Sequence, residues 1–133
     1  MSLSLAEVLA AVYAQLQADV PLVTLVGGRI YNHVPQDTPF PYVRVRLDAM
    51  GEWDTKQDFG YNGDVYCDAW SAKQGDLQPL QIADALREAL HDKPLTLPEG
   101  QCVCLRHLAV SIFVEPDGQA HHIVTRFRTF LSE

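Results

Sequence analysis

The sequence predicts an α+β fold: an antiparallel, possibly mixed, β-sheet with two helices packed on one face, in the order α-β-β-α-β-β. Two observations favour it. Segments in which apolar and polar residues alternate come in pairs, and the segments with helical periodicity stand outside those pairs. With 133 residues and 47% hydrophobic content, the chain is expected to form one domain, residues 1–133, with an ordinary core.

The N-terminal segment predicts a helix. Ser4 is a good N-cap, and Glu7 three residues later completes a capping box. Apolar residues then recur at helical spacing as far as Ala18. The longest uncharged stretch, Val8 to Ala18, is too short and too polar to cross a bilayer, and the start of the chain has no signal-peptide pattern. The cytosol is therefore the expected location of the chain.

The chain is expected to change direction before the first strand. Pro21 and the Gly27-Gly28 pair bracket a short apolar turn at Leu22 to Val26, in which Gly28 supplies a backbone angle that other residues resist. Closely spaced prolines then predict an extended, stiff loop from Asn32 to Phe40, because proline restricts its own backbone and that of its predecessor.

Two alternating segments predict an antiparallel pair of strands. From Tyr42, apolar residues alternate with polar ones, as in a half-buried strand. Its polar positions, expected to face outward, are Arg44, Arg46 and Asp48. In the second segment, Val65, Cys67 and Ala69 lie opposite Tyr66, Asp68 and Trp70. The polar segment from Gly51 to Gly60 is predicted to be a loop between the two strands.

The second half of the chain predicts one more helix and a closing hairpin. Asp76 is a candidate N-cap, and the helix is expected to stop near Pro94. Its apolar stripe consists of Ile82, Ala83, Leu86, Ala89 and Leu90. Two further strands, Val103 to Val114 and His122 to Leu131, flank Glu115-Pro116-Asp117-Gly118, which is typical of a type I turn followed by a bulge.

The sequence carries no catalytic or metal-binding signature. Three cysteines are too few for a disulfide framework, so reduced, buried thiols are expected. A zinc site is less favoured than core packing, because the candidate ligands lack the paired spacing of zinc sites; they are Cys102, Cys104, His107, His121 and His122. A hydrolase using Cys67 or Cys104 lacks a recognised local motif, and Gly27-Gly28 lacks the other residues of a phosphate loop, so no metal and no cofactor is expected.

Charge placement is more informative. Between Asp48 and Asp76, seven acids against two lysines give −5 of the net charge of −7, which disfavours DNA binding through counterion release. Arginines occupy alternating strand positions, so that each pair lies on one face of its strand: Arg44 with Arg46, and Arg126 with Arg128. Such a face is either solvated or complementary in charge to a neighbouring subunit, and both alternatives remain open.

Aromatic residues gather around the acidic segment, namely Trp53, Phe59, Tyr61 and Trp70. Aromatic residues in a polar segment mark either a contact surface or a loop folded back on its own core. The candidate subunit or partner contacts are therefore Arg44, Arg46, Trp53, Asp54, Asp58, Arg126 and Arg128.

Short motifs follow one another over most of the chain: Gly28-Arg29-Ile30-Tyr31, Val34-Pro35-Gln36, Pro39-Phe40-Pro41-Tyr42-Val43, Trp70-Ser71, Ile82-Ala83-Asp84-Ala85-Leu86 and Arg126-Phe127-Arg128. In this order and at these separations, they resemble the small tail-completion or tail-terminator proteins of tailed phages and prophages. The resemblance implies a non-enzymatic protein of the virion tail. Such a protein forms a ring, commonly of six subunits, at the head-proximal end of the tail, ends tube growth and joins the tail to the head.

The implied partners are further copies of the chain, the tail-tube protein and the head-neck connector proteins, while DNA passes nearby without specific binding and no membrane is involved. The alternative from another class is a small-molecule or peptide-binding module of a soluble cytoplasmic protein, in which Trp53, Tyr61 and Trp70 line a cleft. Such a module would remain a monomer near 14.9 kDa, whereas a ring-forming chain would give larger species.

Overall fold

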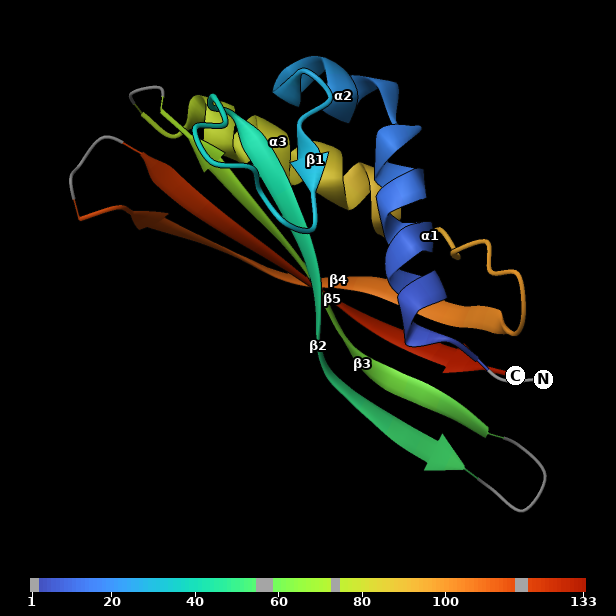
Figure 1. The fold of residues 1–133 in the computed structure, drawn as a ribbon. Helices are drawn as coiled ribbons and strands as arrows, with labels where there is room; N and C mark the ends of the chain where they lie inside the picture. The colour runs from blue at the N-terminus through green and yellow to red at the C-terminus, as the bar shows by residue number, and fades with distance from the viewer. Residues whose placement is uncertain (1–2, 55–58, 73–74, 117–119) are drawn as a thin grey trace.

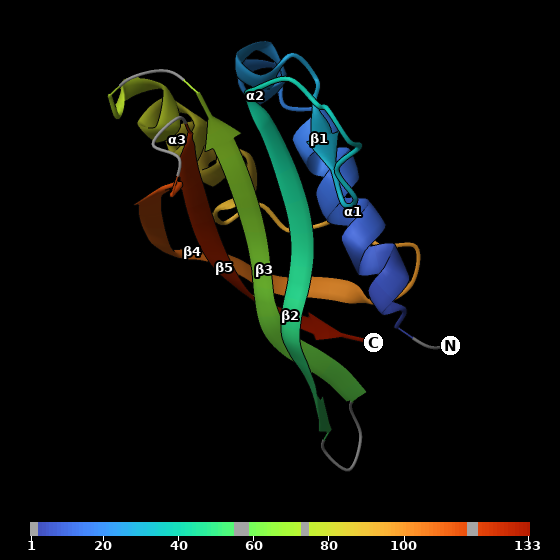
Figure 2. The same cartoon turned by 60° about the vertical axis from the view of Figure 1, so that its left-hand side comes forward.

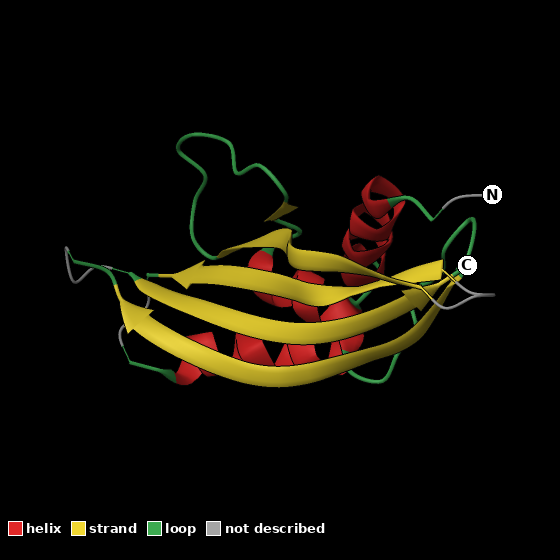
Figure 3. Cartoon of the chain, turned by 90° about the horizontal axis from the view of Figure 1, so that it is seen from below, coloured by secondary structure: helices red, strands yellow, loops and turns green. Residues whose placement is uncertain are grey.

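A computed structural model describes residues 3–54, 59–72, 75–116 and 120–133. Within these residues the chain forms three helices, α1 (Leu5–Gln17), α2 (Val20–Val26) and α3 (Leu77–Leu90). It also forms five strands, β1 (Ile30–Tyr31), β2 (Tyr42–Asp54), β3 (Phe59–Ser71), β4 (Gln101–Val114) and β5 (His121–Ser132). The helices lie on one face of a strongly curled sheet (Figures 1 and 3). The predicted α+β class is confirmed, whereas the predicted two-helix layer is wrong, because α2 is a third helix.

The N-terminal helix begins as the sequence predicts. The Ser4 Oγ accepts a hydrogen bond from the Glu7 N–H at 3.3 Å, and Val8, Val12 and Leu16 are fully buried. Among the described residues, no single helix is long and apolar enough to cross a membrane. The pair formed by α1 and α2 has the length and composition of a span but is bent by 83° between the two helices.

The predicted apolar turn at Leu22 to Val26 is wrong, because these residues belong to α2. Asp19 caps this helix by accepting the Leu22 N–H at 3.1 Å, and Pro21 fits the first turn, where its missing N–H costs nothing. Gly27 adopts a left-handed conformation with φ of 63° and ends the helix after seven residues. Tertiary burial of Leu22 and Val26 stabilises a helix that is too short to show a clear periodicity.

The second predicted helix is α3, and its whole predicted apolar stripe is buried. The prediction that Asp76 caps it is wrong. Asp76 occupies the N-cap position, but its side chain makes no capping hydrogen bond and lies 3.6 Å from the His121 Nε2 instead.

The sheet has the strand order β1-β2-β3-β5-β4. All neighbouring pairs are antiparallel except β1 and β2, which run parallel, so the sheet is mixed. β1 was not predicted because two residues are too few to show an alternating pattern. The loop from Asn32 to Phe40 is confirmed as irregular, and it connects β1 to β2 at one edge of the sheet (Figures 1 and 2).

The predicted polar loop from Gly51 to Gly60 is wrong at both ends. β2 continues to Asp54 and β3 begins at Phe59, so the two strands form a long hairpin that projects from the helices (Figure 1). A Cβ on Gly60 would lie 2.1 Å from the Leu131 carbonyl oxygen and 2.7 Å from the Trp53 ring, which explains why glycine stands there. The hairpin end has no apolar face against the helices, and for this reason its sequence shows no alternation.

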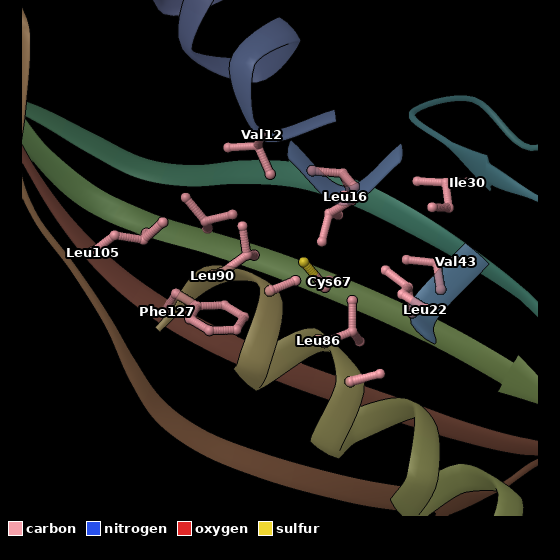
Figure 4. Close-up of a cluster of buried hydrophobic side chains, with 14 of the residues drawn as sticks. Val12, Leu16, Leu22, Ile30, Val43, Cys67, Leu86, Leu90, Leu105 and Phe127 are labelled. Atoms are coloured by element: carbon pink, nitrogen blue, oxygen red, sulfur yellow. The ribbon is translucent and has the colours of Figure 1, made fainter. Parts of the chain in front are cut away.

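The core fills the space between the helices and one face of the sheet. Alternate residues of β2, β3 and β5 meet α1, α2 and α3 there, and the closing hairpin is confirmed as β4 and β5 (Figure 4). Its largest fully buried side chains include Leu16, Leu22, Leu86, Leu90, Leu105 and Phe127. The predicted turn at Glu115-Pro116-Asp117-Gly118 lies partly outside the described residues.

Candidate partner-binding surface

The helices leave the opposite face of the sheet without a second layer, and we call it the open face. Because strand side chains alternate, the polar positions of β2, β3 and β5 all point to this face. The open face includes Tyr42, Arg44, Arg46, Asp64, Tyr66, Asp68, Trp70, His122, Arg126 and Arg128. Two of these strands, β3 and β5, lie side by side in the sheet although Asp64 and Arg126, which they carry, are 62 residues apart in the sequence.

Asp68 lies at the centre of the first charge cluster on the open face. Its side chain is 1% exposed, although no helix covers it. The Arg46 Nε donates to its Oδ2 at 2.8 Å and the Arg44 Nη2 donates to the same oxygen at 3.2 Å. The His122 Nε2 lies 3.4 Å from its Oδ1. Neighbouring guanidiniums therefore exclude water from this carboxylate and satisfy its charge.

Asp64 is the centre of the second cluster, on the same strand. The Arg128 Nε donates to its Oδ1 at 2.8 Å, and the Arg126 Nη2 donates to its Oδ2 at 3.0 Å. Its side chain is 6% exposed. Each buried acid thus lies between two arginines of a neighbouring strand, and such charge-assisted hydrogen bonds fix the orientation of the arginines.

We call these six residues, Arg44, Arg46, Asp64, Asp68, Arg126 and Arg128, the paired-arginine surface. Their arginine side chains remain 35–40% exposed, so part of each guanidinium faces solvent. Arg46 also lies over the Tyr66 ring at 4.1 Å, a cation–π contact. Four cations against two carboxylates give this surface a local charge of +2 on a chain whose net charge is −7.

The structure brings together all four arginines that the sequence nominates. The part played by Asp64 and Asp68 was not predicted, because both residues counted only as members of an acidic segment. The alternation around Val65, Cys67 and Ala69 did place Asp68 on the polar side of its strand, a prediction that the pairing of β2 with β3 confirms. It could not show that β5 lies beside β3, and this neighbour supplies Arg126 and Arg128.

The candidate nucleophiles and metal ligands among the cysteines and histidines lie within the described residues. Cys67 is fully buried in the core, and burial, reinforced by Asp68, raises the pKa of its thiol, so the nucleophilic thiolate is disfavoured. The cysteines at positions 67, 102 and 104 are free thiols. Over the part of the chain that the structure describes, no group of three histidine, cysteine or acidic side chains is placed to hold a metal ion.

A family model described as tail completion protein gp17 matches residues 10–132. The chain belongs to this family. It is accordingly a structural protein of the phage virion tail and not an enzyme. The resemblance predicted from the short motifs is confirmed.

Two solved structures share the fold of this chain. A chain from the virion of a native gene transfer agent particle is 28% identical, with a TM-score of 0.88 over 99% of this chain and 100% of that one. The bacteriophage SPP1 gp17 protein is 24% identical, with a TM-score of 0.66 over 95% of this chain and 91% of that one, and it supports the fold. No curated protein sequence matches this chain significantly.

Of the other nominated contact residues, Trp53 lies apart from the paired-arginine surface. Trp53 is half-buried near the end of the β2–β3 hairpin, and its Nε1 is buried without a hydrogen-bond partner among the described residues. Asp58 and the side chain of Asp54 lie outside the described residues.

The aromatic residues of the rival binding-module hypothesis do not meet in one cleft. A hollow of about 320 Å³ on the open face is lined by Trp70, Tyr42 and Arg44 together with Asn32, His33 and Val34 of the neighbouring loop. Neither Trp53 nor Tyr61 lines it. The Tyr61 hydroxyl instead donates to the Glu52 carboxylate at 3.4 Å near the hairpin end.

Proposed function

We propose that this chain forms a ring of six copies at the head-proximal end of the phage tail, where it ends tube growth and joins the tail to the head. The match to the gene transfer agent virion carries the proposal. It extends over 99% of this chain with a TM-score of 0.88, so the entire domain has the shape of a subunit that works inside an assembled particle. A sheet with one uncovered face suits that role, because it leaves a large surface for other proteins.

The paired-arginine surface is the proposed contact with carboxylates of the tail-tube or neck proteins. Asp64 and Asp68 already hold the four guanidiniums in place, so little side-chain entropy is lost when a partner binds. The arginine side chains are partly exposed, and their remaining N–H groups suit bidentate binding of acidic side chains. The net charge of −7 disfavours a grip on DNA, which passes through the ring without specific binding.

Sedimentation velocity tests the ring. The purified chain, alone at rising concentration and then with the tail-tube protein, is expected to give species several times heavier than the 14.9 kDa monomer. Electron microscopy of particles made without the chain should show tails of irregular length that are not joined to heads. A chain that stays monomeric under all these conditions would contradict the proposal.

Replacing Arg126 or Arg128 by glutamate is a poor test of the paired-arginine surface, because each substitution would place a second carboxylate against buried Asp64. Arg106 offers a cleaner one. It lies opposite Arg128 on the open face, is exposed, and has no ion pair among the described residues. Arg106→Glu should leave folding intact while lowering the fraction of joined particles about tenfold. Arg87→Glu, on α3, is the control for a charge reversal elsewhere on the chain; Arg87 pairs with the exposed Glu88 at 3.1 Å, a surface contact whose loss costs little. Equal joining by the two variants would count against this surface.

A further inference from the structure

The open face carries a second feature, a row of aromatic rings in contact that crosses β2, β3, β5 and β4. We call it the aromatic row; in order across the sheet it consists of Phe40, Tyr42, Trp70, His122 and Phe113. Tyr42, Trp70, His122 and Phe113 are directly opposite one another on β2, β3, β5 and β4, and Phe40 precedes β2 in the edge loop. Residues from four separate segments therefore form one continuous line.

The spacing of the rings is close throughout. Phe40 stacks on Tyr42 with ring centres 5.6 Å apart, and Tyr42 stacks on Trp70 at 5.1 Å. Trp70 stacks on His122 at 4.4 Å with the planes only 6° apart, and His122 meets Phe113 at 6.0 Å. The Trp70 Nε1 donates to the Glu115 carboxylate at 3.1 Å, which fixes the central ring. The interior of the row is thus well ordered.

The rings at the two ends of the row are exposed to solvent. Phe40 is 43% exposed at the β1 edge of the sheet, and Phe113 is 54% exposed at the β4 edge. Phe113 is accompanied by the exposed side chains of Leu108, Val110 and Val114. Exposed apolar side chains gathered on an edge strand are typical of a contact with another protein.

The β4 edge is protected over only part of its length. The Asp92 N–H donates to the Leu105 carbonyl at 2.8 Å, and the His107 N–H donates to the His91 Nδ1 at 2.9 Å, so the turn after α3 occupies the middle of the strand. From residue 109 to residue 114, β5 is the only hydrogen-bonding neighbour within the described part of the chain. The unprotected half is therefore the half that carries Phe113.

We propose that Phe113 of one copy packs against Phe40 of the next copy, so that the aromatic rows of neighbouring subunits join into one belt around the assembly. Strand direction favours a second copy as the occupant. Within one copy, β4 runs antiparallel to both β1 and β2. When a second copy in the same orientation places its β1 edge beside β4, the two neighbouring strands are therefore antiparallel, as most neighbouring strands within the sheet are. The contact joins two different patches, which allows a ring to close.

Levels along the strands also agree. Phe113 is level with Tyr42, because Tyr42, Trp70, His122 and Phe113 are paired in turn across the sheet, and Phe40 stacks on Tyr42. A neighbour without axial offset therefore brings Phe40 to the height of Phe113. This contact uses the edges of the sheet and leaves the paired-arginine surface open for other partners. The inference rests on the ring proposed above and names the surfaces that close it.

A pair of thiols provides the first test. Phe40 precedes β2 and Phe113 lies on β4, and β3 and β5 stand between these two strands. At ordinary strand spacing, β2 and β4 are about 14 Å apart, so thiols introduced at both positions cannot meet within one copy. Under mild oxidation, the double variant Phe40→Cys/Phe113→Cys should give a ladder of covalent multiples of 14.9 kDa. A mixture of the two single variants should stop at dimers. Phe40→Cys combined with Phe130→Cys is the control and should give no ladder.

Assembly of alanine variants provides the second test, by sedimentation with the tail-tube protein present. Phe113→Ala and Phe40→Ala should each weaken assembly about tenfold, and the double variant should be little weaker than either single one. Phe130→Ala, an exposed phenylalanine of the open face outside the row, should assemble as the wild type does.

The outcomes separate the two proposals. If the wild-type chain assembles but the ladder is absent and Phe113→Ala assembles like Phe130→Ala, the belt is wrong and the ring stands. If the wild-type chain itself does not assemble, both are wrong. Thermal unfolding of each variant identifies any that fails to fold, and the ladder then decides.

Discussion

The two faces of the sheet obey different rules. The face under the helices is filled by apolar side chains such as Val45, Val65 and Phe127, which pack without regard to charge. The open face has no covering layer, yet it buries Asp64 and Asp68 beneath the arginines of neighbouring strands. Burial on this chain is therefore achieved in two ways, by a second layer of secondary structure and by side-chain pairing within one layer. The second way leaves charged groups available to a partner.

The largest expected effect tests the helix-covered face. Phe127 is fully buried, so Phe127→Ala removes a whole ring from the core and should lower the free energy of unfolding by about 3–5 kcal/mol. Phe130→Ala, three residues later on the open face, should cost about 1 kcal/mol or less, since this side chain is already partly exposed. Urea denaturation monitored by circular dichroism measures the free energy of unfolding of each variant. Equal decreases in the two variants would contradict the stated difference between the two faces.

A smaller effect tests the open face. Asp68→Asn removes the charge that Arg44 and Arg46 share and should lower the free energy of unfolding by about 2 kcal/mol. Asp48→Asn is the matched control, because Asp48 is exposed and lies 4.0 Å from Arg46; it should cost no more than about 0.5 kcal/mol. If the two substitutions cost the same, the buried acids do not hold the arginine surface together.

A third prediction concerns how stability depends on pH through His107, and its expected effect is small. His107 lies on the helix-covered side of β4 and packs edge-on against Phe127. Burial, then Arg87 and His91, lowers the pKa of His107 below its ordinary value of 6.5. The unfolded chain therefore binds this proton at a pH at which the folded chain does not. Stability should fall as the pH drops through 6.5 toward the folded pKa.

His107→Phe should flatten that part of the pH dependence. The measurement is urea denaturation of wild type and variant between about pH 8 and about pH 5. The other histidines remain in both proteins, so the difference between the two curves isolates His107. A difference that does not change with pH would show that this ring carries no stability-linked proton.

Local patterns determined a large part of this protein in advance. The alternation from Tyr42 and around Val65 gave two strands, the Ser4 cap and helical spacing gave α1, and the apolar stripe of α3 was predicted residue by residue. Each of these signals comes from residues within one turn or one strand of each other, so no knowledge of distant neighbours is needed. The family likewise followed from short motifs taken in order.

Only the tertiary structure decided which segments became neighbours. The place of β5 between β3 and β4 brings Arg126 and Arg128 to Asp64, and it puts His122 between Trp70 and Phe113. Burial of Asp64 and Asp68 depends on guanidiniums from other strands, so no local pattern could distinguish these acids from the exposed Asp48. The sequence by itself determined strands, helices and family, because those depend on near neighbours. The pairing of charges and rings across the sheet depends on strand order, which near neighbours do not encode.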